Sequence, residues 1–523
     1  MNPPQAVSIW ERNRDRFFTA AFLFLLLYSA IRSVLKAASR PLWFDELLTS
    51  IVARQPTISS LWRALVHCVD GQPPPFYLWQ RFFDHLVSSE QIAFRVTSIL
   101  GFCAMQWCLF VWLKKRHSIP IAFVACLLPL MTTLFATYVV EARPYALEIG
   151  FLAVALVAYQ RVSKPFWTFV LGLSLIAAES SHYYALFVFV AFLAAEAFYS
   201  LKTRSFRSAV WIALCSGLVP LAVFWPLLSR FRECYGAHVW YGTATFVGTL
   251  KIYGWLFGIS SAAPGAGSST AIATIALPVA VLLGVFFLVH QSLKENTEDQ
   301  GNSHLNILTA GILLTPFLML FVTKLNHTGL IPRYLLPSIL GVTLGAGYGI
   351  SLLSKKVVTL VGVLLFFCVA VQEVGFWFSY YEAYQLGFNS QPYGISLIQS
   401  AGHGELPVVV SEGHDFLELN RYAPPSIAQR LIFVAAPDAA VAHNRPDTND
   451  RNLLILRDFA ALHVVEYSKI KDSKPKPGFL LYSDPTPEND PDWFVAWLAA
   501  EGWSLLKLKS DGHATVFLVE LRN

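Results

Sequence analysis

The chain has 523 residues, of which 55% are hydrophobic and only 14% are charged, with a formal net charge of +5 and a mean hydropathy of +0.50. Soluble domains carry about 25% charged residues, so the composition excludes a soluble protein with a single core. It also excludes a disordered chain and a nucleic-acid-binding tail, because the sequence contains no block of basic residues. The seven cysteines lack the spacing of a metal site and fall mostly in apolar segments, so neither a zinc site nor a disulfide framework is predicted.

Long apolar segments predict about 11 membrane-spanning helices between Phe17 and Phe378, each close to the roughly 20 residues that a bilayer requires. They cover about residues 17–37, 92–113, 118–137, 144–160, 165–180, 183–200, 208–228, 271–290, 305–323, 337–353 and 357–378. Basic residues flank alternate spans and all fall on one side of the membrane: Arg12, Arg14, Arg16, Lys114, Lys115, Arg116, Arg161, Lys164, Lys202, Arg204, Arg207, Lys355 and Lys356. The positive-inside rule makes that side cytoplasmic, so we expect a multi-pass plasma-membrane protein with a cytoplasmic N-terminus.

The first span has one alternative interpretation, as a cleavable signal, because basic residues precede it and Ala37-Ala38-Ser39 follow it. We expect it to be retained, since Lys36 interrupts the small-residue region and the alternation of loops fits best with the span in place.

The first outward loop, about residues 38–91, is much longer than an ordinary connection, and such loops are usually functional. Apolar residues recur at helical spacing over residues 58–69 and again over 76–86, after Pro73-Pro74-Pro75. The pattern predicts two short amphipathic helices, with Pro75 suited to a first helical turn. Helices lying in the headgroup plane and a helical hairpin packed on the bundle both fit it.

Two adjacent carboxylates, Asp45 and Glu46, follow Trp43-Phe44 directly after the first span. Desolvation at a membrane surface makes a carboxylate a stronger base unless a cation or a metal ion compensates, and a general base needs that property. An equally simple alternative is that either residue stabilises the N-terminus of a helix over residues 47–54.

Further polar residues fall at the outward ends of later spans. Pro144 divides a long apolar stretch and places Glu141, Arg143 and Tyr145 near the surface. The next outward turn carries His182 and Tyr183, and the last outward loop carries Lys324, His327, Arg333 and Tyr334. Any one of these residues has a simpler explanation, as part of a salt bridge, as a hydrogen-bonded histidine or as a snorkelling cation. Together with Asp45, Glu46 and Asp70, however, they all fall on one side of the membrane, which favours an outward active site.

Residues 381–523 lose the long apolar segments and are predicted to form a small outward-facing α/β domain. Its predicted strands are Leu406–Val410, Arg430–Ala435, Leu453–Leu456, Phe479–Tyr482, Ser504–Leu508 and Ala514–Leu521, and a helix is expected near Asp492–Ala500. The segment contains no cysteine and no glycine-rich phosphate loop, so it predicts no chemistry of its own.

Five motifs in this order resemble bacterial GT-C glycosyltransferases: Asp45-Glu46, Gln72-Pro73-Pro74-Pro75-Phe76-Tyr77, Glu141-Ala142-Arg143-Pro144-Tyr145, Ser181-His182-Tyr183-Tyr184 and Arg333-Tyr334-Leu335-Leu336-Pro337. The match is to protein O-mannosyltransferase-like enzymes, glycosyltransferase family 39 and its relatives, including the lipid A aminoarabinose transferases, and it covers about residues 10–380. The resemblance implies a GT-C transmembrane domain over residues 1–380 and leaves 381–523 as the extracytoplasmic domain.

The resemblance further implies an integral-membrane enzyme that moves a sugar, with inversion, from a polyprenyl-phosphate donor to a lipid, glycan or protein acceptor on the outer face of the membrane. Asp45 matches the family's catalytic aspartate, and Glu46 matches an acidic neighbour that in some relatives helps bind a divalent metal ion or the acceptor. Arg333 and Tyr334, with Arg143 and His182, are expected at the donor phosphate. The remaining candidate site residues are Glu141, Tyr145, Gln72, Tyr183 and Lys324.

Two other classes of function stay open. A secondary transporter or flippase needs ionisable residues at the membrane midplane and an internal repeat. Neither is evident, although Glu196 and Glu373 fall within or near predicted spans. A non-catalytic membrane protein of envelope glycan assembly would use the C-terminal domain for binding.

Overall fold

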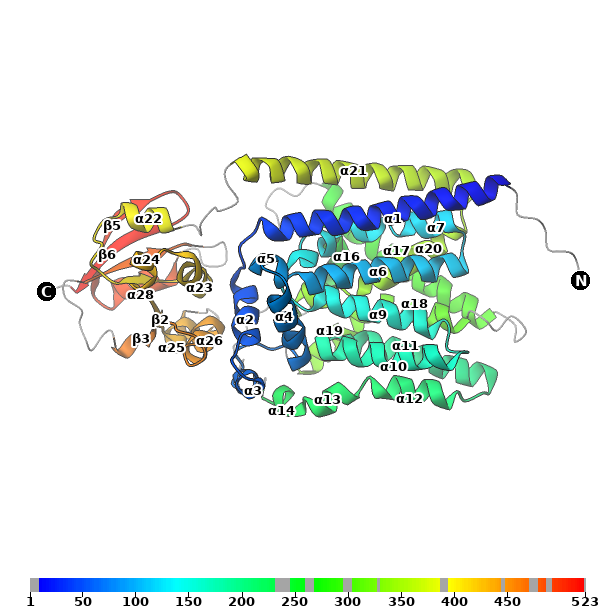
Figure 1. The fold of residues 1–523 in the computed structure, drawn as a ribbon, viewed down its shortest axis with the longest axis horizontal. Coiled ribbons are helices and arrows are strands. Elements are labelled where there is room, and N and C mark those ends of the chain that lie inside the picture. The colour runs from blue at the N-terminus through cyan, green and yellow to red at the C-terminus, as the bar shows by residue number, and fades with distance from the viewer. Residues whose placement is uncertain are drawn as a thin grey trace, which may run out of the picture. The chain divides into compact units, whose positions relative to one another are not determined.

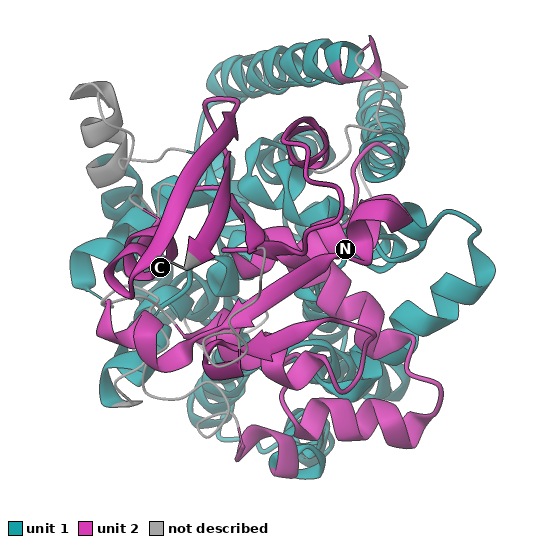
Figure 2. Cartoon of the chain, turned by 90° about the vertical axis from the view of Figure 1, so that its left-hand side faces the viewer, with its two compact units in different colours: residues 1–38, 72–225, 241–382 teal, residues 39–71, 226–240, 383–523 magenta. Residues whose placement is uncertain are grey.

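A computed structural model describes residues 9–230, 245–258, 268–294, 303–326, 330–385, 394–443, 447–469, 478–485 and 492–521. The chain divides into two compact units, coloured separately in Figure 2. The first unit holds residues 1–38, 72–225 and 241–382, and the second holds residues 39–71, 226–240 and 383–523. Each unit is described by itself.

The first unit is a bundle of helices, many of which run in nearly the same direction (Figure 1). In chain order they are α1 (Ile9–Ala38), α4 (Pro74–Leu86), α5 (Glu90–Ala93), α6 (Val96–Arg116), α7 (Ile119–Ala125), η1 (Leu128–Met131), α8 (Thr133–Ala136), η2 (Tyr138–Val140), α9 (Tyr145–Tyr159), α10 (Pro165–Ser181), α11 (Ala185–Thr203), α12 (Ser208–Ser216), α13 (Val219–Val223), α14 (Trp225–Leu228, at the junction with the second unit), α16 (Phe246–Leu256), α17 (Ser268–Lys294), α18 (Ser303–Leu313), α19 (Thr315–Asn326), η4 (Pro332–Leu335), α20 (Ser338–Ser351) and α21 (Lys355–Gln385). Each predicted span coincides with an apolar helix or with a broken one.

Within the described residues, five helices are long and apolar enough to cross a membrane, and up to seven spans result if each of two bent helix pairs counts as one. Three shorter apolar helices, α9, α20 and the α12–α13 segment, add to these. The chain is a multi-pass membrane protein, and the number of about 11 spans stays a prediction.

Helices α6 and α9 approach closely because glycines face each other at their crossing. A Cβ atom on Gly101 would lie 2.3 Å from the Ala146 carbonyl oxygen, and one on Gly150 would lie 2.5 Å from the Gly101 carbonyl oxygen. Small residues at such crossings let membrane helices pack backbone to backbone. This contact fixes the start of α9, which follows directly on Arg143.

Two carboxylates within the bundle, Glu373 and Glu196, are each paired with an arginine. The Glu373 carboxylate on α21 accepts hydrogen bonds from Arg32 Nε (2.9 Å) and from the Tyr28 hydroxyl (2.5 Å) on α1, which runs alongside α21 (Figure 1). The Glu196 carboxylate pairs with Arg207 and accepts a hydrogen bond from the Tyr159 hydroxyl at 3.0 Å. Because a buried charge requires a partner, both carboxylates have a structural explanation.

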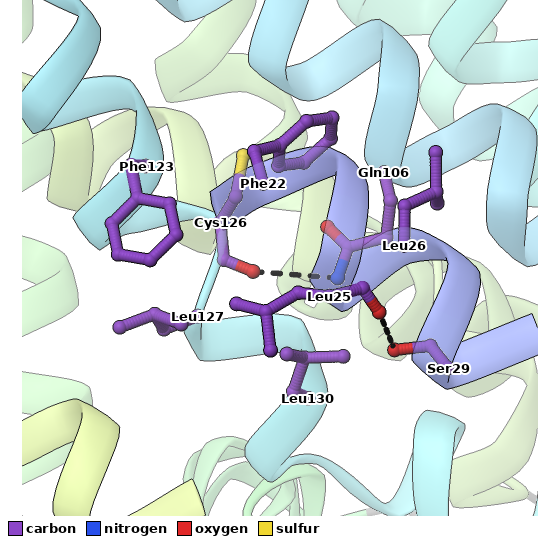
Figure 3. A pocket seen from close by; sticks show the side chains of 9 residues that line it. All are labelled: Phe22, Leu25, Leu26, Ser29, Gln106, Phe123, Cys126, Leu127 and Leu130. Atoms are coloured by element: carbon purple, nitrogen blue, oxygen red, sulfur yellow. Dashed lines mark hydrogen bonds between the residues drawn. The ribbon is translucent and has the colours of Figure 1, made fainter. Parts of the chain in front are cut away.

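A small cavity lies between α1, α6 and α7, with Gln106 among apolar neighbours (Figure 3). The Gln106 amide donates to the Cys126 carbonyl at 3.3 Å. The volume of about 10 Å³ suits one water molecule, which would satisfy the buried Gln106 Oε1. The cavity is therefore a packing feature of the bundle.

The first loop forms the expected helices. They are α2 (Phe44–Ala53) and α3 (Ile58–Val66) in the second unit and α4 in the first, with Pro75 in the first turn of α4. Helix α4 buries Phe76, Tyr77 and Gln80 and exposes Leu78, Trp79, Phe82 and Leu86. An aromatic apolar face of this kind suits the membrane interface.

The C-terminal part of the second unit is an α/β fold. Its elements are α22 (Ile395–Ser400), β1 (Val408–Val410), α23 (Gly413–Tyr422), α24 (Pro425–Ala428), β2 (Leu431–Ala435), α25 (Pro437–Ala442), α26 (Thr448–Leu456), β3 (Val464–Glu466), β4 (Phe479–Ser483), α28 (Trp493–Ala500), β5 (Trp503–Ser510) and β6 (Thr515–Leu521). The sheet order is β3-β2-β1-β4-β6-β5. Strands β3, β2, β1 and β4 are parallel to one another, β6 is antiparallel to β4, and β5 is antiparallel to β6.

Three expectations for the second unit and its cysteines were wrong or incomplete. Residues Leu453–Leu456, predicted as a strand, end helix α26, because Leu453 and Leu456 bury one helical face. Strand β3 was not predicted. Cys68 is in a disulfide, although no disulfide framework was predicted from the sequence.

The Glu412 carboxylate links the end of β1 to two helices. It accepts hydrogen bonds from the Gly413 N–H (2.8 Å) and from Asn449 Nδ2 on α26 (3.2 Å), and it pairs with His414 Nδ1 at 2.7 Å. Burial alone would raise the pKa of Glu412, but the hydrogen bonds and charge of His414 outweigh it and leave the pKa below its usual range. Burial acts to lower the pKa of His414. The hydrogen bond and charge of Glu412 act to raise it and prevail, so the pKa of His414 lies above its usual value.

These two pKa shifts predict how the stability of the second unit depends on pH. The lowered Glu412 pKa contributes stability above the ordinary value of 4.5 that is lost as pH falls through the folded pKa. The raised His414 pKa contributes stability below 6.5 that is lost as pH rises through the folded pKa. The pair therefore stabilises most between pH 4.5 and 6.5. We expect His414→Gln to lower the thermal unfolding temperature of the purified full chain most in this window and least above pH 8.

The variant comparison is needed because other groups also titrate. Burial raises the pKa of Asp415 to about 8 and that of Asp450 to about 7, so the wild-type unit also loses stability toward alkaline pH through these carboxyls. His414 is not among the groups that shift the pKa of Asp450, whereas its charge acts to lower the pKa of Asp415 and so adds to the difference between the two proteins. A difference between wild type and His414→Gln that does not change from pH 5 to pH 9 would contradict the pairing.

Candidate active site

Asp45 and Glu46 lie in the first turn of α2 in the second unit and have different surroundings. Glu46 is fully buried, and its Oε2 atom accepts a hydrogen bond from the Trp43 N–H at 3.1 Å. This is the reciprocal half of a capping box, so Glu46 has the helix-stabilising role that the sequence left open. Asp45 is partly exposed beside it.

Helix α23 packs against the residues that precede and begin α2. The Tyr422 hydroxyl accepts from the Leu42 N–H (2.7 Å) and donates to the Leu42 carbonyl (3.2 Å). The His414 ring lies edge-on to the Phe44 ring with centroids 4.4 Å apart, and the Asp45 carboxylate is near enough to raise the pKa of His414 after the larger effect of Glu412. The Asp45 segment is thus built into the C-terminal fold.

In the first unit, a cluster of aromatic rings surrounds His182, the residue that ends α10. The His182 ring lies 5.2 Å from that of Tyr145, 5.1 Å from that of Tyr184 and 5.5 Å from that of Tyr334, centroid to centroid. Tyr184 and Tyr334 stack at 4.3 Å. Residues from three distant motifs of the sequence therefore form one wall, which we call the His182 cluster: Tyr145, His182, Tyr184 and Tyr334.

Two arginines lie at this wall. The Arg333 guanidinium is 5.9 Å from the centre of the Tyr334 ring. Burial, and to a smaller extent the charges of Arg143 and Arg333, lower the pKa of His182 to about 3. His182 is therefore neutral at physiological pH, so the positive charge at the cluster comes from the arginines.

The position of Arg143 follows from the backbone around it. The Ser98 hydroxyl on α6 contacts two carbonyl oxygens of the segment before α9, that of Glu141 at 2.6 Å and that of Arg143 at 3.0 Å. These carbonyls lie outside a regular helix and need such a partner when buried. The contact ties Glu141 and Arg143 to the crossing of α6 and α9.

The other predicted residues lie apart from these contacts or outside the described residues. The Gln72 N–H donates to the Tyr77 hydroxyl at 3.3 Å, which fixes the start of α4. Tyr183 is half-buried in the turn between α10 and α11, and Lys324 is exposed near the end of α19. Asp70 accepts a hydrogen bond from the Gly71 N–H at 2.7 Å. His327 lies outside the described residues.

Two buried carboxylates near the His182 cluster were missed by the sequence reasoning. Glu148 is fully buried one turn into α9, and its Oε2 atom lies 3.0 Å from His182 Nδ1. Glu179, 1% exposed near the end of α10, interacts electrostatically with Glu148. A carboxylate one turn inside an apolar span was the available signal, because such residues usually serve function. Glu148 therefore lies directly beside the ring of His182.

The carboxylates at Asp45 and Glu46 do not fit a metal site in this structure. Within the described part of the chain, no group of three or more His, Cys, Asp or Glu side chains is placed to hold a metal ion. Glu46 is buried against the Trp43 N–H instead of facing an open coordination position. We therefore derive no step through a metal ion.

No protein-family model matches the chain, and no curated protein matches it. Solved structures do. ArnT from Cupriavidus metallidurans bound to undecaprenyl phosphate matches with a TM-score of 0.54 and 14% identity, over 95% of this chain and 97% of that one. The same protein in the apo state matches with a TM-score of 0.56 and 13% identity, over 95% of this chain and 98% of that one. At these identities the likeness shows the fold, and it spans both units of the chain. The chain has the GT-C fold of integral-membrane glycosyltransferases.

Proposed function

We propose that the protein is a membrane glycosyltransferase that moves a sugar from a polyprenyl-phosphate donor to a hydroxyl-bearing lipid, glycan or protein acceptor on the outer face of the plasma membrane. The observation that carries the proposal is the convergence of Arg143 and Arg333 on the His182 cluster at one end of the bundle. The structural likeness to ArnT bound to undecaprenyl phosphate supports the same class of donor.

The arginines fit a phosphate group that gains charge as it leaves. A guanidinium presents paired donors that match phosphate oxygens, and its charge persists at any physiological pH. As the bond between the sugar and the phosphate oxygen breaks, the electron pair stays on the phosphate, and fixed positive charge stabilises the transition state. The neutral His182 and the surrounding tyrosines form a close-packed aromatic wall beside these charges.

Asp45 is the residue we assign to the acceptor. The acceptor oxygen attacks the anomeric carbon, its proton passes to the Asp45 carboxylate, and the configuration inverts because the phosphate leaves from the opposite face. Glu46 supports this arrangement as a helix cap through the Trp43 N–H. A donor held in the headgroup plane requires such groups at helix ends, since catalysis depends on positioning.

Transport is less well supported. The carboxylates that fell within predicted spans, Glu196 and Glu373, are each paired with an arginine and so have a structural role. The disulfide at Cys68 supports the placement of the first loop on the oxidising, outer side.

Replacing Asp45 tests the assigned base. We expect Asp45→Asn to lower sugar transfer about 100- to 10,000-fold, the usual contribution of a general base, because the amide accepts no proton. Transfer is measured with purified protein and a panel of polyprenyl-linked sugars. Asp438→Asn, a change at an exposed residue of the second unit, is the control and is expected to retain wild-type activity. Undiminished transfer by a folded Asp45→Asn protein would contradict the assignment of Asp45 as the base.

Arg333 is tested by graded replacement. Arg333→Lys keeps a charge without the paired donors, whereas Arg333→Ala removes both. We therefore expect donor KM to rise in the order wild type, lysine, alanine, with a loss of kcat/KM of about 10-fold for lysine and about 100-fold for alanine, since charged hydrogen bonds contribute roughly 1.5–3 kcal/mol. Arg12→Ala, in the first turn of α1, is the control. Equal donor KM values for all three forms would argue against phosphate contact.

The orientation is tested by cysteine labelling of intact cells. A cysteine at exposed Glu405 is expected to react with a membrane-impermeant maleimide, and one at exposed Arg204 is expected to react only after lysis. The opposite pattern would place the site on the cytoplasmic face and overturn the proposal.

A further inference from the structure

Helix α23 makes three different contacts with the short segment that carries Asp45. Tyr422, at its C-terminal end, holds both backbone groups of Leu42 through its hydroxyl. The carboxylate of Glu418, one turn earlier, lies beside the Phe44 N–H, which acts to lower the Glu418 pKa against the larger, opposite effect of burial. His414, in the first turn, places its ring against that of Phe44. The contacts are spaced four residues apart, so they lie along one face of α23.

The Glu418 contact has a specific purpose in the structure of α2. Phe44 is the first residue of that helix, and the first backbone N–H groups of a helix have no partner within it. The Trp43 N–H donates to Glu46, and the Glu418 carboxylate lies beside the next N–H along the chain, that of Phe44. Asp45 follows directly, so these two carboxylates flank the backbone immediately before it.

The face of α23 is itself held rigidly to the sheet. Glu412, at the end of β1, caps α23 through the Gly413 N–H and binds both His414 and Asn449. The Phe416 ring of α23 packs 5.5 Å from that of Phe433 on β2, where both side chains are buried. The backbone of the Asp45 segment is therefore connected, through α23, to the core of the C-terminal fold.

We propose that α23 is part of the catalytic apparatus, with Glu418, Tyr422 and His414 as positioning residues that set the place of the Asp45 carboxylate. The inference rests on the proposed function, in which Asp45 is the base. None of the three touches the reacting atoms. They act through Asp45, because a base misplaced by about 1 Å can lose on the order of 100-fold in rate. The C-terminal fold, which offered no chemistry by sequence, then has a catalytic purpose.

The test compares Glu418→Ala with Glu418→Gln in the full-length purified enzyme. Alanine removes the carboxylate that lies beside the Phe44 N–H, whereas glutamine keeps an amide oxygen, an acceptor, at that place. We expect kcat to fall about 10- to 100-fold for alanine and to stay within about threefold of wild type for glutamine, the usual scale for supporting residues. Donor KM is expected to be unchanged in both. Glu405→Ala, at a carboxylate that is 72% exposed in the same unit, is the matched control and is expected to match wild type.

A double-variant comparison separates positioning from general stability. In the Asp45→Asn background, Glu418→Ala is expected to cause no further loss of the residual transfer, because residues that act as a unit are not additive. An equal loss in both backgrounds, or a Glu418→Ala protein with wild-type kcat, would overturn the inference while leaving the base assignment intact. An Asp45→Asn protein with full activity would overturn the base assignment and this inference with it.

Folding is followed by thermal unfolding of each variant. If Glu418→Ala does not fold, Tyr422→Phe supplies the test, since it removes only the hydroxyl that holds Leu42. We expect a several-fold lower kcat with unchanged donor KM, and an unchanged kcat would overturn the inference. His414→Phe, which keeps the ring contact with Phe44, is expected to retain more activity than His414→Ala.

Discussion

The cost of an unpaired charge in lipid determines most of this structure. Within the bundle, Arg32 pairs with Glu373 and Arg207 pairs with Glu196, so that these charges near the spans have partners of opposite sign. The ionisable residues of the candidate site, Arg143, His182 and Arg333, instead lie at the ends of helices or directly beside them. A lipid-linked substrate presents its phosphate at the same depth. The constraint that keeps charge out of the bilayer core therefore also favours arginines at the depth where we propose that the donor phosphate binds.

The same constraint explains what could be predicted from the sequence. Long apolar segments must be helices in lipid, so the predicted spans coincide with helices although their boundaries and bends do not follow from composition. The helices of the first loop were predicted by their periodicity. Glu148 was missed because the sequence does not show that α9 turns its first buried carboxylate toward His182, which is 34 positions later in the numbering. Leu453–Leu456 was misassigned because a short apolar run fits a helix and a strand equally well.

Contacts between distant parts of the chain lie beyond such reasoning. The hydrogen bond between Leu42 and Tyr422 joins residues 380 positions apart. Neither residue type predicts it, since a tyrosine near a helix end has many available partners. The C-terminal domain consequently had no assignable chemistry from sequence, whereas its helix α23 contacts the segment that carries the proposed base. Sequence patterns identify residues that lipid or helix geometry constrains locally, and they leave supporting residues such as Glu418 unmarked.

Two adjacent carboxylates that look equivalent in the sequence thus have different roles in the structure. Glu46 is buried and accepts from the Trp43 N–H, and the Glu418 carboxylate lies beside the Phe44 N–H at the start of the same helix. The Asp45 side chain is partly exposed beside His414. In the proposed mechanism, Glu46 therefore has the capping role at the start of α2, and Asp45 has the role of the base at the same turn.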